Sequence, residues 1–283
     1  MFRRGSPLLL LGLFVFGCAD HEASASPARS GQALRVVSLH DVTTELMIEL
    51  GAGAQLCGMN EPVDLEEAVA QRVAAVPRVA SLESIVALRP DLVLGLGVVA
   101  EREPELVARL RQAGIEVRLW DPATLDDVAE LTGWVGRRVG AEARTQALLA
   151  SLGAGAAQAG RPRAEPLRVF VYDCCDPPFT AGGKTVLSDL IARAGGRNVF
   201  GEVDADWTHV SWEEVVARKP ELIVVHAYHY EGQGDVADKR RTLAALPRLG
   251  SVPTAVLPLG CSLGGLRSLE GLARLRSAIG AQS

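Results

Sequence analysis

Histidines and tyrosines near the ends of predicted strands are the residues of this chain with the clearest potential for ligand chemistry. His40 follows the first predicted strand, and a later one is followed by His226, Tyr228, His229 and Tyr230. Imidazole binds transition metals directly and can coordinate the metal of a bound complex axially, a role open to His226 and His229. Because no H-x-x-E-H or C-x-x-C spacing accompanies them, we predict a polar cleft rim rather than a direct metal site.

The other candidate ligand-binding residues also follow strand ends, where parallel sheets bind small molecules. The aromatic face of Trp207 suits a broad, partly apolar chelate or macrocycle. Arg267 could pair with a carboxylate or phosphate of such a ligand. The alternatives are packing at the edge of a folded unit for Trp207 and a solvated helix start for Arg267. The remaining candidate residues are His40, Asp41, Asn60, Pro178 and Phe179, and the segments 97–100 and 173–179 are candidates as well.

Catalytic and nucleotide-binding motifs give no support for an enzyme. No G-x-S-x-G elbow, Walker loop or Rossmann glycine fingerprint opens a helix after a strand. Segment 182–185, Gly-Gly-Lys-Thr, ends like a phosphate-binding loop, but that loop needs a glycine where Pro178 stands. We therefore predict a non-enzymatic protein without a cofactor. A secreted metallohydrolase is the alternative, and it would require metal-dependent turnover.

A fourteen-residue pattern occurs twice and indicates how these residues are positioned. It reads SLESIVALRPDLVL at 81–94 and SWEEVVARKPELIV at 211–224. Each copy predicts a helix, a proline break and a buried strand. A repeat this long at this separation indicates two copies of one supersecondary block, too few for a solenoid. Two similar lobes leave a cleft between them, and clefts between lobes bind small ligands.

The N-terminus has the pattern of a signal peptide over residues 1–17. Arg3 and Arg4 precede an apolar run at 8–16, which is too short to span a bilayer as a mature helix. The following Gly17-Cys18 resembles a bacterial lipobox, so we expect Cys18 to carry lipid and residues 18–33 to form a flexible tether. Ordinary export with a nearby cleavage site is the alternative. Either way, the mature protein is expected outside the cytoplasm.

Four cysteines remain after this leader, and an exported protein can form disulfides. Cys174 and Cys175 follow the first strand of the second lobe, and Cys261 follows its last strand. A disulfide between Cys261 and either of them is therefore a hypothesis. Adjacent cysteines rarely bridge each other, because disulfide geometry favours separated Cα atoms. Cys57, within a predicted strand, is expected to be a buried thiol.

The order of predicted elements indicates an α/β fold with two Rossmann-like lobes of parallel-rich sheets. A single long helix is expected to join them and to keep lobe motions small. The expected divisions are an N-terminal lobe at 34–122, a connecting helical region at 123–163 and a C-terminal lobe at 164–283. A net charge of −5 gives no basic footprint for nucleic acid. The predicted strands are 34–39, 55–59, 92–96, 115–120, 167–173, 222–226 and 254–259.

Several motifs in order make the chain resemble a known family. They are Val36-Val37-Ser38-Leu39 with Thr44-Glu45, the run from Leu82 to Val93, Pro177-Pro178-Phe179-Thr180-Ala181-Gly182, the run Ala194 to Phe200, and Trp207 with Val210-Ser211. Together they look like the substrate-binding proteins of bacterial ABC importers for cobalamin and ferric siderophores. The resemblance implies a periplasmic, monomeric, lipid-anchored receptor that delivers a metal chelate to a permease dimer with its cytoplasmic ATPase. Corrinoids and ferric siderophores are the leading ligands, and heme or a free metal ion is the alternative.

The resemblance also implies a docking role for one glutamate on each lobe. The matching positions are Glu83 and Glu213, and two equivalent anions suit a symmetric permease dimer. Ordinary helix capping is the alternative, because Ser211 and Glu214 form an S-x-x-E pattern and an acid in a first helical turn is favoured by the macrodipole. Glu214 would replace Glu213 if the register shifts by one residue.

Overall fold

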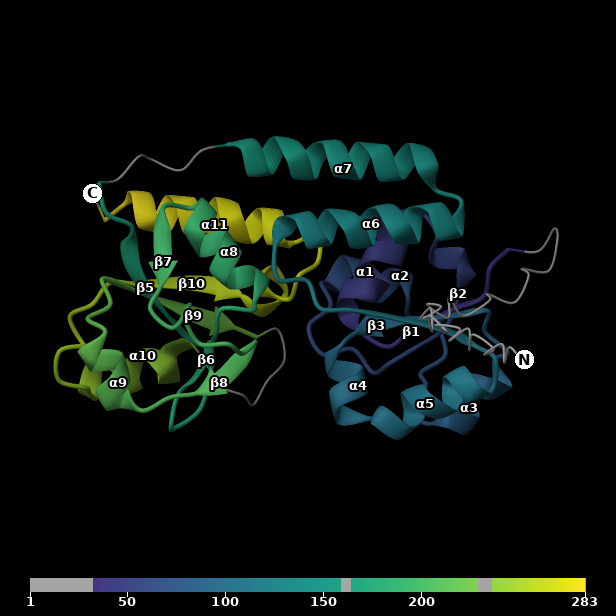
Figure 1. The fold of residues 1–283 in the computed structure, drawn as a ribbon, viewed down its shortest axis with the longest axis horizontal. Coiled ribbons are helices and arrows are strands. Elements are labelled where there is room, and N and C mark those ends of the chain that lie inside the picture. Colours follow the sequence, from purple (N-terminus) through teal and green to yellow (C-terminus); the bar gives the residue numbers. More distant parts are fainter. Residues whose placement is uncertain (1–32, 159–163, 229–235, 283) are drawn as a thin grey trace, which may run out of the picture.

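The computed structural model describes residues 33–158, 164–228 and 236–282. It contains two α/β lobes that lie side by side, with helices α6 and α7 running along one side of both (Figure 1). The signal peptide, Cys18, His229 and Tyr230 lie outside the described residues. Among those described, no helix combines the length and apolarity needed to cross a membrane.

The N-terminal lobe is built on a parallel sheet in the strand order β2-β1-β3-β4. Its strands are β1 (Val36–Ser38), β2 (Leu56–Met59), β3 (Leu92–Leu96) and β4 (Glu116–Trp120). Every residue of β3 is buried, as expected for a central strand that helices cover on both faces. The helices are α1 (Asp41–Glu49), η1 (Gly53–Gln55), α2 (Glu67–Arg72), α3 (Leu82–Ala87), α4 (Val98–Arg102) and α5 (Pro104–Gln112).

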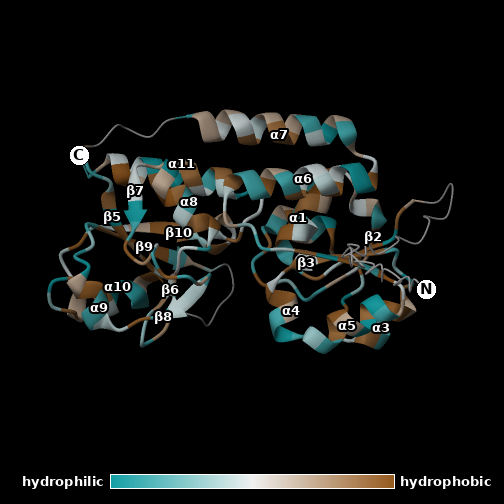
Figure 2. Cartoon of the chain, viewed as in Figure 1, coloured by the Kyte–Doolittle hydropathy of each residue, from teal (hydrophilic) through white to brown (hydrophobic). Residues whose placement is uncertain are grey.

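The C-terminal lobe is built on a second parallel sheet, in the order β10-β9-β5-β7. Its strands are β5 (Leu167–Tyr172), β7 (Gly196–Asn198), β9 (Leu222–Ala227) and β10 (Thr254–Pro258). The central strands of both sheets are coloured hydrophobic in Figure 2, which matches their near-continuous apolar sequences. The helices are α8 (Val186–Arg193), α9 (Trp212–Ala217), α10 (Val236–Ala245), η2 (Leu259–Ser262) and α11 (Ser268–Gly280).

A small antiparallel pair, β6 (Phe179–Ala181) with β8 (Trp207–His209), is added to the C-terminal lobe. These strands and β7 are absent from the sequence prediction. Each is three residues long, too short for an alternating pattern to stand out. The predicted two-lobe α/β class is confirmed, including the parallel sheets.

The fourteen-residue repeat corresponds to equivalent structure in the two lobes. Helices α3 and α9 each begin at a serine, Ser81 or Ser211, whose hydroxyl accepts from the backbone N–H three residues later in a capping box. Each helix is followed by a residue with positive φ, Arg89 at 46° and Lys219 at 50°. The same turn chemistry therefore orients both copies.

The acid that follows each proline makes the same bond in both lobes. The backbone N–H of Arg35 donates to Asp91 Oδ2 at 2.9 Å, and that of Arg168 donates to Glu221 Oε2 at 3.0 Å. When β1 is matched with β5, β2 with β7, β3 with β9 and β4 with β10, the two parallel sheets have the same strand order. The second lobe thus repeats the plan of the first.

Helices α6 (Leu125–Val139) and α7 (Glu142–Ala157) connect the lobes. Leu125 and Val128 pack in the core of the C-terminal lobe, whereas Leu131 and Val135 pack in the core of the N-terminal lobe. Helix α7 returns along α6 after the left-handed residue Gly140, φ 70°. The expected single strut is therefore a pair of helices, and α6 already contacts both lobes.

Candidate functional site

A cavity of about 750 Å³ lies between the lobes, and residues of both lobes line it. Its N-terminal wall comes from residues after β1, β2, β3 and β4, at the carboxyl ends of parallel strands. Small ligands bind at such strand ends in α/β proteins. The polar and aromatic lining residues considered below are His40, Asp41, Asn60, Trp120, Asp121, Asp173, Phe179, Lys184, Asp206, Trp207 and Tyr228.

The β6–β8 pair places the aromatic groups of the C-terminal wall. Phe179 and Trp207 lie on facing strands with ring centroids 5.9 Å apart and an interplanar angle of 24°. The ring of His209 lies next to that of Phe179, with centroids 4.8 Å apart, and its Nδ1 is 3.1 Å from the carbonyl oxygen of Pro177. The pair presents a stacked aromatic surface to the cavity, where a flat apolar ligand could pack.

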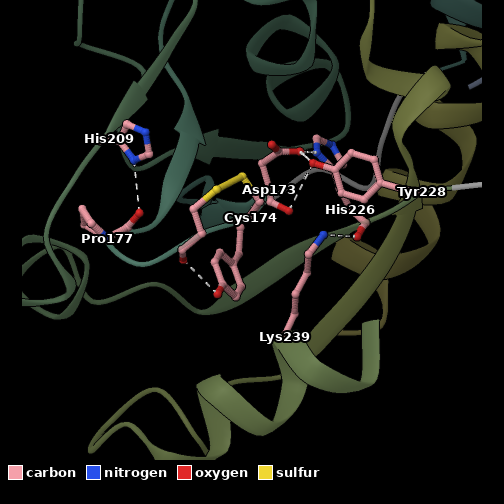
Figure 3. Close-up of a disulfide and its surroundings, with 9 residues drawn as sticks. Asp173, Cys174, Pro177, His209, His226, Tyr228 and Lys239 are labelled. Atoms are coloured by element: carbon pink, nitrogen blue, oxygen red, sulfur yellow. Dashed lines mark hydrogen bonds and ion pairs between the residues drawn. A yellow bond between two sulfur atoms is a disulfide. The ribbon is translucent and has the colours of Figure 1, made fainter. Parts of the chain in front are cut away.

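Asp173, at the end of β5, is held by a network of buried polar groups (Figure 3). Its Oδ1 lies 2.6 Å from His226 Nδ1 and accepts from the Tyr228 hydroxyl at 2.7 Å. Lys239 donates to the His226 carbonyl oxygen at 2.7 Å and lies over the Tyr228 ring. Burial acts to raise the pKa of Asp173, but His226, Tyr228 and Lys239 outweigh it and the pKa is lowered. Asp173 is therefore an ionised carboxylate at the cavity wall.

His226 supports this network from behind the cavity. It is completely buried, its ring centroid lies 5.6 Å from that of Trp207, and it does not line the cavity. Its Nε2 has no hydrogen-bond partner among the described residues. In this arrangement His226 orients Asp173, and Trp207 stands beside it, so an axial bond from His226 to a bound metal would require rearrangement.

The N-terminal wall is held mainly by backbone groups. His40 caps α1, and its Nδ1 accepts from the Val42 N–H at 3.2 Å. Burial lowers the pKa of His40 to about 4, against the opposing charge of Asp41. Asp41 Oδ2 accepts from the N–H groups of Val63 and Asp64 at 2.8 and 2.6 Å. His40 is therefore neutral at pH 7, and Asp41 orders the loop after β2.

Asn60 ends this wall at the neighbouring strand. Its Nδ2 donates to the carbonyl oxygen of Glu61 at 2.7 Å, which assigns its Oδ1 as an acceptor without a protein partner in the described chain. Trp120 reaches the cavity from the end of β4 and meets Trp134 edge-on at 5.1 Å. The N-terminal wall thus has one indole near the cleft but no stacked aromatic pair.

Arg267 does not line the cavity but joins the lobes beside it. Its Nη1 lies 3.6 Å from Glu45 Oε1 and 3.7 Å from Asp64 Oδ2, and its Nε lies 3.2 Å from Glu66 Oε1. The Gly260 N–H also donates to Asp64 Oδ2, at 2.8 Å, from the C-terminal lobe. The predicted pairing of Arg267 with a ligand anion is replaced here by pairing with acids of the opposite lobe.

Glu45 is a buried acid of this interlobe group. Burial raises the pKa of Glu45 to about 8, and the nearby charges of Glu66, Asp41 and Asp64 add to that rise, whereas Arg267 opposes it. Burial outweighs the attraction of Arg267 because Arg267 is 3.6 Å from Glu45 and also pairs with Asp64 and Glu66. At neutral pH the carboxyl group of Glu45 is therefore largely protonated.

The disulfide in the structure joins Cys174 to Cys175 (Figure 3). The hypothesis of a bond from Cys261 to either of them is wrong, because Cys261 is a free, fully buried thiol. Cys261 packs in the apolar core with its carbonyl oxygen against Gly271. Burial raises the pKa of Cys261 to about 12 and also raises that of Cys57, which is half-buried rather than enclosed.

Sequence reasoning selected part of this site and missed part. Pro178 is buried but does not line the cavity, and its carbonyl oxygen accepts from Val210 N–H at 3.0 Å. The single-residue predictions omitted Asp121, Lys184 and Asp206. Asp121 directly follows β4 and Asp206 directly precedes Trp207, and these positions could have indicated both residues. Within the described ranges no group of three or more His, Cys, Asp or Glu residues could hold a metal ion.

Comparison with known proteins agrees with this geometry. Residues 36–252 match the family model described as periplasmic binding protein. The chain belongs to the periplasmic binding protein family. The motifs that suggested this family are therefore confirmed, together with a substrate-binding function in transport.

Relatives within the periplasmic binding protein family include vitamin B12-binding proteins. That of Salmonella typhimurium is 34% identical over 68% of this chain and 72% of its own length. That of Yersinia pestis is 30% identical over 70% of this chain and 71% of its own. Among solved structures, the heme-binding protein RhuT of Roseiflexus sp. RS-1 in apo form is similar, with a TM-score of 0.72 and 26% identity over 89% and 99% of the two chains.

The two glutamates singled out for docking occupy matching positions in this member of the periplasmic binding protein family. Glu83 and Glu213 are both exposed and stand second in α3 and α9, respectively. Glu214 instead closes the capping box, accepting from the Ser211 N–H at 2.8 Å. Helices α3 and α9 lie on the side away from α6 and α7 (Figure 1). Capping in the C-terminal lobe therefore uses Glu214 and leaves Glu213 exposed.

Proposed function

We propose that this protein captures a corrinoid, the chelate class of vitamin B12, and delivers it to an ABC permease. The observation that carries the proposal is the stacked pair of Phe179 and Trp207 on the wall of an interlobe cavity. It occurs in a chain 34% identical to a vitamin B12-binding protein. A broad macrocycle can pack its face on this pair while its rim meets the polar groups of the N-terminal wall.

The size of the cavity supports a ligand of this class. Its volume of about 750 Å³ lies in the upper part of the usual range for small-molecule sites, roughly 300–1,000 Å³. The cavity also opens between lobes, so part of a larger ligand can extend beyond it. The proposed role is capture without chemistry, and it needs no resident cofactor.

Heme is the second candidate, supported by the structural similarity to a heme-binding protein at 26% identity. Ferric siderophores remain a third ligand class for the same cleft. Neither changes the proposed transport role, because each would occupy the same interlobe cavity. The experiment must therefore identify which of these ligands binds.

A thermal-shift panel tests the ligand. The mature chain without lipid is heated with cyanocobalamin, a ferric hydroxamate chelate or hemin at matched concentrations. A ligand at about one hundred times its Kd raises the free energy of unfolding by about 2.7 kcal/mol. We expect cyanocobalamin to raise the melting temperature and the others to have little effect. A shift with hemin or the ferric chelate alone would contradict the corrinoid proposal.

We further infer that the protein is a monomer held at the membrane by lipid on Cys18, with Glu83 and Glu213 facing the permease. The exposed, matching positions of the glutamates support this docking mode. Two equivalent anions would meet the two halves of a symmetric permease dimer and would set the register of docking. Labelling with a radioactive fatty acid tests the anchor: the native chain should incorporate label, and Cys18→Ser should not.

A further inference from the structure

Carboxylates dominate the charged groups of the cavity wall. Among the described residues, the cations that line it are Arg102 and Lys184. Lys184 is already paired with Asp204 at 2.9 Å, and His40 is neutral at pH 7 because burial lowers its pKa to about 4. The wall therefore has a clear excess of negative charge. The acids that line it are Asp41, Glu101, Glu103, Asp121, Asp173 and Asp206.

Asp121 and Asp206 differ from the other aspartates of this wall. Asp41 and Asp173 each have one carboxylate oxygen, Oδ2 and Oδ1 respectively, occupied by backbone or side-chain donors. Asp121 and Asp206 are exposed, and within the described part of the chain neither side chain forms a hydrogen bond or ion pair. Both carboxylates are therefore available to a ligand without breaking a contact of the protein.

Backbone geometry places these two carboxylates on opposite walls of the cleft. Asp121 follows β4, and its carboxylate lies where a Cβ would stand if Gly97 had a side chain. Asp206 precedes β8, and its carbonyl oxygen accepts from the Gly182 N–H at 2.6 Å. Burial raises the pKa of Asp206, and the charge of Asp121 adds to the rise, so the two groups are electrostatically coupled across the lobes.

We propose that the cleft selects its chelate by the chemistry of the rim: it takes a chelate with hydrogen-bond donors such as primary amides and rejects one with carboxylates. Asp121 and Asp206 accept these donors from opposite walls. The inference rests on the proposed function, since it assumes a chelate in this cavity. An N–H group bonded to a carboxylate is favourable, whereas a ligand carboxylate would face like charge in a partly desolvated site. Selectivity then comes largely from repulsion of the wrong ligand.

Two corrinoids with the same ring and axial ligands provide a matched test. Dicyanocobinamide carries amides around its rim, and dicyanocobyrinic acid carries carboxylates at those places. Isothermal titration calorimetry at pH 7 and low salt gives a Kd for each. We expect the amide form to bind at least about tenfold more tightly, which corresponds to the loss of one good charged hydrogen bond or one repulsive contact.

Changing both aspartates tests whether these groups cause the preference. In Asp121→Asn with Asp206→Asn, the acceptors stay but the charges are removed. Binding of the acid form should improve because the repelling charges are gone, and binding of the amide form should weaken because each charge-assisted hydrogen bond becomes a neutral one, so the two affinities should come within about threefold of each other. Glu130→Gln with Glu142→Gln is the matched control, because both residues are exposed on the connecting helices away from the cavity. This control should keep the full preference.

The outcomes separate this inference from the function on which it rests. Equal affinity of the native protein for the two corrinoids, or an unchanged preference in the double aspartate variant, would overturn selection by rim chemistry and leave corrinoid capture standing. Binding of neither corrinoid would overturn the proposed function and this inference with it. Circular dichroism melts of each variant confirm that the compared proteins are folded.

Discussion

The two lobes share one plan but contribute different chemistry to the cleft. Their parallel sheets have the same strand order, and α3 and α9 begin and end with the same turn geometry. The C-terminal lobe alone adds the β6–β8 pair, which carries Phe179 and Trp207. The repeat therefore accounts for the frame and for the matching glutamates, whereas the departure from the repeat accounts for the aromatic ligand surface.

The acids of the two walls are also held differently. Asp41 in the N-terminal lobe is fixed by two backbone N–H groups. Asp173 in the C-terminal lobe is fixed by the side chains of His226 and Tyr228, with Lys239 behind them. One wall is thus ordered by local loop geometry, and the other depends on a buried side-chain network. Substitutions in that network should affect the C-terminal wall alone.

The largest effect, on ligand uptake, is expected from the matching glutamates that the two lobes share. Glu83→Ala combined with Glu213→Ala should abolish uptake of the ligand by cells while leaving its Kd unchanged, because neither glutamate lines the cavity. Each single variant should reduce uptake to a similar degree, since the two positions are equivalent. Uptake of labelled cyanocobalamin and calorimetry on the purified protein provide the two readouts.

Glu130→Ala with Glu142→Ala is the control for this docking test. These residues are equally exposed, but they lie on α6 and α7, on the other side of the molecule. The control should support normal uptake. Normal uptake by the Glu83 and Glu213 double variant would remove the docking role and, with it, the functional meaning of the repeat.

The next largest effect, on ligand affinity, concerns the aromatic surface that the C-terminal lobe has and the N-terminal lobe lacks. Trp207→Ala should weaken cyanocobalamin binding about 30-fold or more, since a stacked aromatic at the centre of a binding site typically contributes 2 kcal/mol or more on truncation. Trp120→Ala, in the N-terminal wall, should weaken it less because that indole packs edge-on with Trp134. Calorimetry measures both. A larger loss for Trp120→Ala would reverse the assignment of the aromatic surface to the C-terminal lobe.

A third test concerns the ion group that joins the lobes. The pKa of Glu45 rises from 4.5 to about 8 in the folded protein, so between these values the folded state binds more protons than the unfolded state. The stabilisation from this group is fully present below pH 4.5 and is lost as the pH rises toward 8. Glu45→Gln should remove this loss and should exceed the native protein in stability at pH 8.5, by on the order of a few kcal/mol.

Urea unfolding at pH 5 and pH 8.5 measures this difference. Glu130→Gln, which changes an exposed acid on α6, should follow the native pH dependence. If Glu45→Gln and the native protein lose stability equally between these pH values, then Glu45 is ionised throughout and the interlobe group is an ordinary ion-pair cluster.

The smallest effect compares the helix caps of the two copies. Ser81→Ala and Ser211→Ala each remove an N-cap acceptor and should lower the free energy of unfolding by about 0.5–2 kcal/mol. Because the cap geometry is the same, we expect losses that agree within about 0.5 kcal/mol. Thermal or urea unfolding checks this. A loss confined to one lobe would show that the repeat is equivalent in shape but not in energetics.

The frame of this fold was predictable because its signals are local. Apolar runs such as Leu92–Leu96 identify buried strands, and the serine, proline and acid of each repeat identify the helix start and turn. Trp207 was identified for the same reason, from its place in a motif. Lining residues such as His40, Asp41 and Asn60 were predicted from their place after strand ends.

The remaining site features depend on contacts between distant segments. His226 meets Asp173 across 53 residues, and Arg267 meets Asp64 across 203 residues. No local pattern shows that an arginine at a helix start pairs with acids of the other lobe. The Cys174–Cys175 bond was missed because a general preference for separated cysteines was applied to a turn that brings the neighbouring sulfurs together.

Amide hydrogen exchange, measured with and without cyanocobalamin, tests most directly whether ligand binds between the lobes. Peptides that contain Trp120 and Asp121 come from one wall, and peptides that contain Asp173, Asp206 and Trp207 come from the other. The account predicts slower exchange in both sets when the ligand is present. Slower exchange in one lobe only, or no change in either, would contradict a ligand site formed by the two lobes together.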